Sequence, residues 1–236
     1  MALTTIAGLF GERYGDGAPR VLALHGWGRD HADFASVLTG VPSVAVDLPG
    51  FGASAAPSTP MGSAGYADAV EPVLDGFPDP PLVVGHSFGG RVALQLAARQ
   101  MVSGLLLVGT PLLRVAPRGH PPLGYRLTRR FRFLLGDERL ERARRQYGSA
   151  DYRAATGVMR DVLVMTVNES YEQLLPTIEC PTRLLWGADD TEVPVSVAEA
   201  ALGLLSDARL RVVPGIGHHL PSVAPSAIRA ELLEML

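Results

Sequence analysis

Short runs of apolar and β-branched residues recur along this chain, and segments of helical length separate them. Glycine and proline bound most of the runs, and these residues end strands and open turns. Strands that alternate with helices predict an α/β fold, with a mostly parallel central sheet and helices on both faces. Residues 3–14 are long enough to add one short antiparallel hairpin or an edge strand. The expected strands are residues 20–26, 43–50, 81–87, 104–110, 182–190 and 208–215, and the expected helices are about 31–38, 63–76, 88–100, 195–205 and 224–235.

Length and composition predict a single domain that spans residues 1–236. Hydrophobic residues make up 47% of the 236 residues, enough to bury one substantial core. No apolar run approaches the roughly 18 residues that a membrane span needs, and the N-terminus lacks the basic leader of a secretory signal. We therefore expect a cytoplasmic protein. The single cysteine, Cys180, rules out an internal disulfide and a cysteine-rich metal site.

All 21 basic residues are arginine, so the chain has no lysine for Schiff-base or P-loop chemistry. The net charge of −3 argues against a general nucleic-acid binder. Residues 111–160 nevertheless hold 12 arginines against 4 acidic residues. The alternation of strands and helices also stops here, from 111 to about 176. We expect a helical lid insertion over this range, because insertions at strand ends often cover a site. A solvated helical face is the alternative.

The sequence GHSFG, residues 85–89, follows a strand-like run and precedes a helix-like one. It matches the G-x-S-x-G pattern of a nucleophile elbow, in which a serine stands on a sharp turn between a strand and a helix. The pentapeptide alone is weak, since a chain with 26 glycines produces such matches by chance. The order of strand, turn and helix makes Ser87 a candidate nucleophile. We expect its neighbour His86 to be a packed, hydrogen-bonded residue, because alternation points it away from the face of Ser87.

A serine hydroxyl needs a base to take its proton and an acid to orient that base. His218 and His219 lie in a glycine-rich turn after the last expected strand, and Asp189 and Asp190 follow the strand before it. From these turns a side chain can reach over the carboxyl edge of the sheet. The order serine, aspartate, histidine along the chain is one that enzymes with a nucleophile elbow use. The residues alone leave both members of each pair open.

The oxyanion of an acyl-transfer reaction needs backbone N–H donors. The N–H of Phe88, directly after the serine, is one candidate. The second is the N–H of Trp27, in the turn after the first long strand. Asp47, at the end of another strand, is expected to stabilise its own turn.

Five segments spread along the chain carry a further signal: HGWG (25–28), VDLPGFGAS (46–54), GHSFGG (85–90), WGADDTEVP (186–194) and GIGHHLP (215–221). Together they resemble the α/β hydrolase superfamily, and the resemblance implies its fold and serine-hydrolase chemistry. In that family the acid is typically the fourth residue of a G-x-x-D turn, which favours Asp190, and the histidine closes a G-x-G-H segment, which favours His218. Two features depart from the family: Thr191 stands where proline is common, and the short chain implies a trimmed N-terminal sheet edge.

The first two of these segments also resemble the biotin-pathway esterases, which cleave a methyl ester on a carrier-bound pimeloyl chain. Those relatives use basic lid residues to dock an acidic carrier. The resemblance therefore implies an acyl carrier protein as a possible partner at the arginine-rich lid.

Together these observations predict a serine hydrolase that cleaves small-molecule carboxylic esters through an acyl-enzyme. Ser87 is the expected nucleophile, His218 the base and Asp190 the orienting acid, with Trp27 and Phe88 as oxyanion donors. Neither a metal nor an organic cofactor is implied. Three alternatives stay open: a thioesterase or carrier-protein ester hydrolase, a carbon–carbon bond hydrolase, and a ligand receptor that retains the three residues but turns over slowly.

Overall fold

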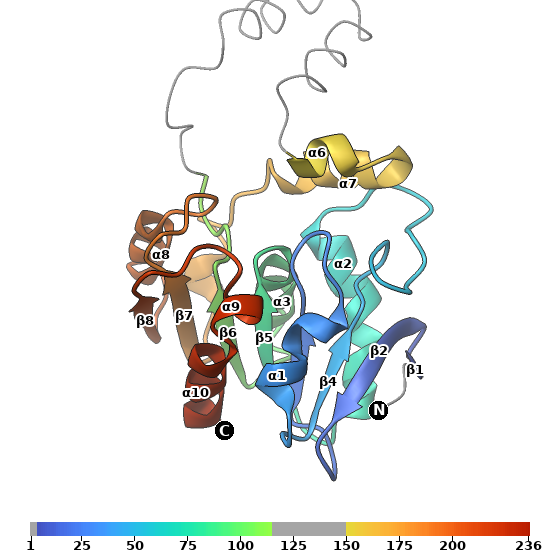
Figure 1. Ribbon diagram of the computed structural model, residues 1–236, viewed down its shortest axis with the longest axis horizontal. Coiled ribbons are helices and arrows are strands. Elements are labelled where there is room, and N and C mark those ends of the chain that lie inside the picture. The colour runs from blue at the N-terminus through green and yellow to red at the C-terminus, as the bar shows by residue number, and fades with distance from the viewer. Residues whose placement is uncertain (1–3, 115–149) are drawn as a thin grey trace, which may run out of the picture.

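Figure 1 shows the computed structural model, which describes residues 4–114 and 150–236. These residues form one sheet of eight strands in the order β1-β2-β4-β3-β5-β6-β7-β8. Neighbouring strands from β4 to β8 in this order are parallel, and β2 is antiparallel to both β1 and β4. The strands are β1 (Thr4–Ile6), β2 (Leu9–Tyr14), β3 (Val21–Leu24), β4 (Ser43–Val46), β5 (Leu82–His86), β6 (Gly104–Val108), β7 (Thr182–Gly187) and β8 (Ala208–Val213).

The sheet confirms the predicted α/β fold. All six expected strands are present, each ending a few residues short of its predicted bounds because the turn residues were counted with the strand. The N-terminal hairpin is also present as β1 and β2, and β2 pairs with β4. At this edge β1 is short, with three residues.

Two of the expected helices are broken into shorter pieces. Residues 31–38 form a 3₁₀ turn followed by one α-helical turn, and residues 63–76 form an α-helix followed by a 3₁₀ helix. Pro72 lies in the first turn of that 3₁₀ helix, where its missing N–H and fixed φ interrupt α-helical hydrogen bonding. The four pieces are η1 (His31–Phe34), α1 (Ala35–Leu38), α2 (Ser63–Val70) and η2 (Glu71–Gly76).

The other helices follow the strands much as predicted. One short helix, α9, was not expected, because it has only four residues and contains Pro221. The remaining elements are α3 (Phe88–Ala98), α6 (Ala150–Ala154), α7 (Gly157–Thr166), η3 (Leu175–Thr177), α8 (Val195–Leu202), α9 (Leu220–Val223) and α10 (Pro225–Met235).

Helices cover both faces of the sheet, as Figure 1 shows. On one face α1 and α10 pack through residues such as Val37 and Leu232 against the sheet residues Ala23 and Val84. On the other, α2, α3 and α8 pack against the alternate sheet residues, which include Leu22 and Leu24, as well as strands β5 to β7. Successive residues of a strand point to opposite faces, so continuous apolar runs in β3 to β6 serve two cores at once.

The helices α6 and α7 lie across the carboxyl edge of the sheet (Figure 1). The lid expected at about 111–176 includes residues 115–149, which lie outside the described residues, and its described part from 150 onward is mainly helical. None of the helices described is long and apolar enough to cross a membrane.

Candidate active site

Ser87 stands on the sharp turn between β5 and α3, with backbone angles φ 49° and ψ −109°. A positive φ in a residue with a side chain is strained, at a cost of roughly 1–3 kcal/mol. The turn is held in place by the N–H of Ser87, which donates to the carbonyl of Val108 on the neighbouring strand β6 at 2.9 Å. The chain therefore has the strand, turn and helix geometry of a nucleophile elbow at this serine.

Glycines on both sides of Ser87 allow α3 to approach the sheet closely. A Cβ atom on Gly85 would lie 2.6 Å from the Cα atom of Gly90, and a Cβ atom on Gly89 would overlap the carbonyl of Leu24 on β3. Because backbone atoms cannot move aside as a flexible side chain can, both positions require glycine. The two outer residues of the G-x-S-x-G pattern are thus fixed by packing around the elbow.

His218, in the turn after β8, places its imidazole between Ser87 and Asp190. Its Nε2 atom lies 3.0 Å from Oγ of Ser87, and its Nδ1 atom lies 2.7 Å from Oδ2 of Asp190. Because an ionised carboxylate can only accept, the second contact assigns the ring proton to Nδ1 and leaves the lone pair of Nε2 for the serine hydroxyl. The three side chains form one hydrogen-bonded series from hydroxyl to carboxylate.

Asp190 uses both of its carboxylate oxygens. Oδ2 faces the histidine, and Oδ1 accepts the backbone N–H groups of Glu192 at 2.9 Å and Val193 at 2.7 Å. The side chain of Asp190 is fully buried, whereas the adjacent Asp189 is exposed. The structure therefore brings Asp190, and not Asp189, to the imidazole.

His219 lies outside this series. Its side chain is 61% exposed, and its Nε2 atom is 3.8 Å from a carboxylate oxygen of Glu192. His218 is the histidine that reaches the serine, as the G-x-G-H segment favours.

The pKa of His218 is set by opposing influences. Burial disfavours the charged imidazolium and lowers the pKa, but the hydrogen bond and charge of Asp190, together with the charges of Glu192 and Asp151, outweigh it. The pKa of His218 therefore lies above its ordinary value, so this imidazole is a stronger base than a free histidine.

The loop after β3 lies directly beside the serine. A Cβ atom on Gly26 would lie 3.5 Å from Cβ of Ser87, which places the next residue, Trp27, at the elbow. Neither the Trp27 N–H nor the Phe88 N–H donates a hydrogen bond to any described residue. Trp27 lines the pocket beside Ser87, and Phe88 follows Ser87 in the chain, so the two N–H groups stay the candidate oxyanion donors.

His25 braces the same loop, a role that sequence reasoning missed. Its Nδ1 atom donates to the carbonyl of Gly26 at 2.7 Å, and its Nε2 atom accepts the N–H of Leu48, at the end of β4, at 2.9 Å. Burial lowers the pKa of His25, which keeps the ring neutral and able to accept at Nε2. The one sequence signal for this contact is the position of His25 as the first residue of the HGWG segment.

His86 contacts the turn after β8 that carries His218. It is buried, and its Nε2 atom donates to the backbone carbonyl of His218 at 2.9 Å. Burial, aided by the nearby His218, lowers the pKa of His86 to about 3, so the ring stays neutral. His86 is thus packed and hydrogen-bonded, as expected, but it lines the same pocket as Ser87, so the expectation that it points away from the face of the serine is wrong.

A pocket of about 360 Å³ opens above the elbow. Trp27 forms an apolar part of its wall and packs edge-on against Phe51 and Phe88. Tyr152 of α6 and Leu163 of α7 pack on the same tryptophan, so these helices cover the aromatic cluster. The residues that line the pocket are Gly26, Trp27, Arg29, His86, Ser87, Ala150, Asp151, Glu192, His218 and His219.

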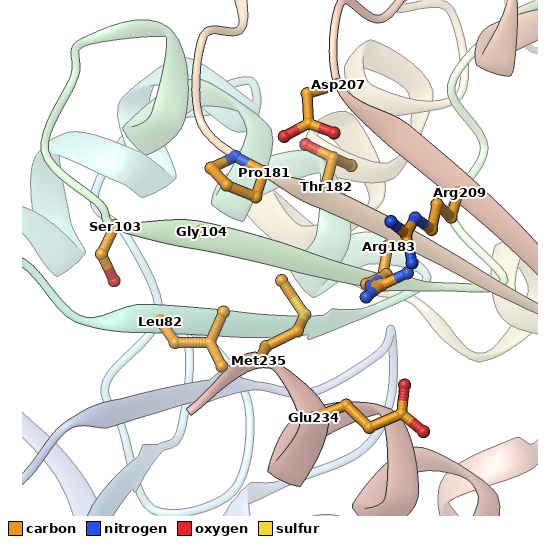
Figure 2. Close-up of a pocket in the computed structure, with 10 residues that line it drawn as sticks. All are labelled: Leu82, Ser103, Gly104, Pro181, Thr182, Arg183, Asp207, Arg209, Glu234 and Met235. Atoms are coloured by element: carbon orange, nitrogen blue, oxygen red, sulfur yellow. The ribbon is translucent and has the colours of Figure 1, made fainter.

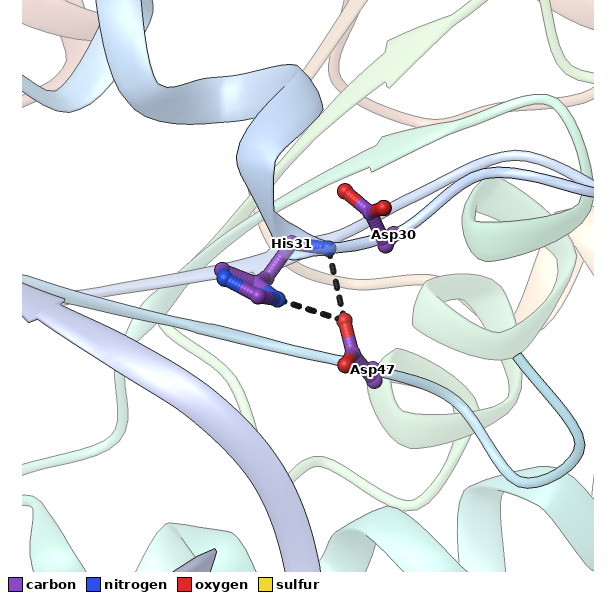
Figure 3. A group of neighbouring side chains, drawn as sticks. All are labelled: Asp30, His31 and Asp47. Carbon is purple, nitrogen blue, oxygen red and sulfur yellow. Dashed lines mark hydrogen bonds and ion pairs between the residues drawn. The ribbon is translucent and has the colours of Figure 1, made fainter. Parts of the chain in front are cut away.

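Asp30, His31 and Asp47 are the one described group whose atoms lie close enough to hold a metal ion (Figure 3). Asp47 is buried, and one of its oxygens accepts both the backbone N–H and the Nδ1–H of His31. Its other oxygen accepts the N–H of Ala53 at 2.8 Å. These three hydrogen bonds tie two loops together, which is the turn-stabilising role expected for Asp47.

A second pocket, of about 270 Å³, lies at the amino ends of β6, β7 and β8 (Figure 2). Its charged residues are Arg183, Arg209, Asp207 and Glu234. Its described lining holds neither a histidine nor a serine paired with a base, whereas Ser87, His218 and Asp190 lie at the opposite edge of the sheet.

Comparisons with known proteins agree with this geometry. The profile of a family described as "Alpha/beta hydrolase family" matches residues 21–231. A pimeloyl-[acyl-carrier protein] methyl ester esterase of Chromobacterium violaceum is 32% identical over 236 residues, which cover 89% of this chain and 91% of that protein. The biotin biosynthesis bifunctional protein BioHC of Cellvibrio japonicus is 29% identical over 85% of this chain, which spans 44% of that longer protein.

Solved structures show the same fold. A thermophilic esterase from Thermogutta terrifontis, in a malate-bound structure, superposes with a TM-score of 0.70 and 25% identity. The match covers 96% of this chain and 93% of that one. The similarity of fold therefore extends over nearly the whole chain.

Proposed function

This chain belongs to the alpha/beta hydrolase family, and from that premise we propose that it is a serine hydrolase that cleaves carboxylic esters through an acyl-enzyme. The observation that carries the proposal is the hydrogen-bonded series from Ser87 through His218 to Asp190, with contacts of 3.0 Å and 2.7 Å. Relatives named as esterases support an ester as the bond that is cleaved.

In the first step Nε2 of His218 removes the proton of Ser87 as Oγ attacks the ester carbonyl. The carbonyl oxygen becomes an oxyanion, and the N–H groups of Trp27 and Phe88 are the proposed donors that stabilise it. Asp190 holds the imidazole in the required tautomer and stabilises the imidazolium that forms. The tetrahedral intermediate then collapses, the C–O bond to the alcohol breaks, and His218 returns its proton to the departing alkoxide.

In the second step water replaces the alcohol. His218 takes a proton from the water as its oxygen attacks the acyl-enzyme, and the same proton is delivered to Oγ of Ser87 when the acid leaves. Ser87 and His218 return to their starting protonation states, so the cycle consumes the ester and water and no cofactor.

We also propose that residues 111–176 act as a lid over the site. The packing of Tyr152 and Leu163 on Trp27 supports this, because it puts α6 and α7 directly against the wall of the pocket.

An ester on an acyl carrier protein is the second candidate substrate. It is favoured by the 32% identity to the pimeloyl-[acyl-carrier protein] methyl ester esterase.

Hydrolysis of p-nitrophenyl esters of increasing acyl length tests the proposal. We expect turnover by the wild-type protein and its loss in Ser87→Ala, with the circular dichroism spectrum unchanged. The matching thioesters and a methyl ester on acyl carrier protein, run beside them, would identify the preferred class. A protein that binds these esters without cleaving any would be a receptor and would refute the proposal.

A further inference from the structure

The mouth of the pocket carries an acidic side chain that the mechanism above does not use. Glu192 follows Asp190 by two residues, and its backbone N–H donates to Oδ1 of Asp190. Its carboxylate lies near the imidazole, with Oε2 3.8 Å from Nε2 of His218. The side chain is 56% exposed, so it faces both the imidazole and solvent.

This position places Glu192 on the leaving-group side of the reaction. Nε2 of His218 must come within hydrogen-bond distance of the departing alcohol oxygen, since it delivers the proton there. The two contacts at Nε2, 3.0 Å to Ser87 Oγ and 3.8 Å to Glu192, put the carboxylate within about 7 Å of the serine oxygen. An alcohol bound in this pocket therefore leaves beside the Glu192 carboxylate.

Among the described residues that line this pocket, a second carboxylate lies near Glu192. Asp151, from α6, lines the same pocket, and neither it nor Glu192 has an arginine within 4.0 Å among the described residues. The one arginine in the lining, Arg29, is held by both oxygens of Asp33 and by Ser222. Its charge is already compensated by the partner carboxylate. Among the described residues, the pocket therefore holds two carboxylates, Glu192 and Asp151, that no arginine pairs with.

From this arrangement we infer that Glu192, assisted by Asp151, is a specificity-determining residue that favours esters of cationic alcohols over esters of neutral or anionic ones. The inference rests on the proposed function and names a substrate class for it. A quaternary or protonated amine two or three bonds beyond the ester oxygen would reach the carboxylate. An anionic group in that place would be repelled.

Rates for matched esters test this assignment. The butyrates of choline, 3,3-dimethylbutanol and glycolic acid share one acyl group and carry a positive, neutral and negative alcohol. Proton release in a pH-stat at pH 8 gives kcat/KM for each. The ratio of rates between two esters in one protein, compared with the same ratio in a variant, cancels their different intrinsic reactivities.

Glu192→Gln keeps the shape of the side chain and removes its charge. We expect the choline-to-neutral ratio to fall roughly three- to tenfold in this variant, the size expected for one partly exposed charge pair. The neutral-to-anionic ratio should fall as well, and Asp151→Asn should lower both further. The difference in these ratios between the wild-type protein and Glu192→Gln should also become smaller in high salt, because salt screens exposed charges. Glu199→Gln, an equal charge change at an exposed position of α8, is the matched control.

The possible failures are distinguishable. If p-nitrophenyl butyrate and the three esters are cleaved but the ratios in Glu192→Gln equal those in Glu199→Gln, the specificity role is overturned and the esterase proposal stands. If the wild-type protein cleaves none of these esters, both proposals are overturned.

Discussion

Oδ2 of Asp190 lies 2.7 Å from Nδ1 of His218, although the strand β8 separates the two residues in the chain. Asp190 is held from behind by two backbone N–H groups, and His218 is held through its own carbonyl by His86. Neither partner of the pair depends on the substrate for its position. The imidazole is thus already oriented toward Ser87, and under the proposed mechanism this lowers the reorganisation needed during catalysis.

Replacing Asp190 tests the orienting carboxylate. In Asp190→Asn the amide can donate to the ring, which favours the tautomer that carries a proton on Nε2 and cannot accept one from the serine. We expect kcat for ester hydrolysis to fall by about 10³- to 10⁴-fold, as in other enzymes with this arrangement. Asp189→Asn is the matched control and should stay close to wild type. A larger loss in Asp189→Asn would transfer the role to that residue.

The two adjacent histidines give a second matched pair. His218→Ala removes the imidazole that contacts Oγ of Ser87, so we expect it to be about as inactive as Ser87→Ala, because residues that act as one unit are not additive. His219→Ala changes an exposed side chain and should retain most of the rate. Comparable losses in both variants would show that the base had been assigned wrongly.

The pH dependence of kcat/KM reports the base. His218 must be neutral to accept a proton, so the rate falls as the pH falls through its pKa. Because the carboxylates around it outweigh burial, we expect the midpoint of this acid limb above 6.5, the value of an unperturbed histidine.

Glu192→Gln removes one of the charges that stabilise the imidazolium, and the midpoint should then move to lower pH. Glu199→Gln should leave it in place. A flat profile between pH 5 and 8 would be incompatible with a histidine base.

The strain at Ser87 predicts an effect on stability. The φ of 49° suits glycine better than any other residue. We expect Ser87→Gly to be inactive but more stable than the equally inactive Ser87→Ala by roughly 1 kcal/mol in the free energy of unfolding. Urea denaturation of the two variants measures the difference. Equal stabilities would mean that the turn is relaxed.

Much of the fold was predictable because buried parallel strands are continuous apolar runs. β3, β5 and β6 are buried along their whole length, and glycine or proline marks their ends. The broken helix at 63–76 and the short helix α9 were harder. Both depend on prolines whose effect on a helix is decided by where the backbone turns.

The candidate site was predictable in part. The order of Ser87, Asp190 and His218 is visible in the chain, but sequence position alone could not separate adjacent residues such as Asp189 and Asp190. Burial separates them, and burial depends on how the turn after β7 folds. The positions of His25 and Glu192 follow from contacts across the site, for which a single sequence carries little signal.

Covalent labelling with a fluorophosphonate tests the central claim most directly. The reagent reacts with a serine whose hydroxyl is activated by a base and whose oxyanion site is formed. We predict one label per chain, located at Ser87 by peptide mapping and absent from Ser87→Ala and His218→Ala. Labelling at another residue, or ester hydrolysis that persists in Ser87→Ala, would contradict the account.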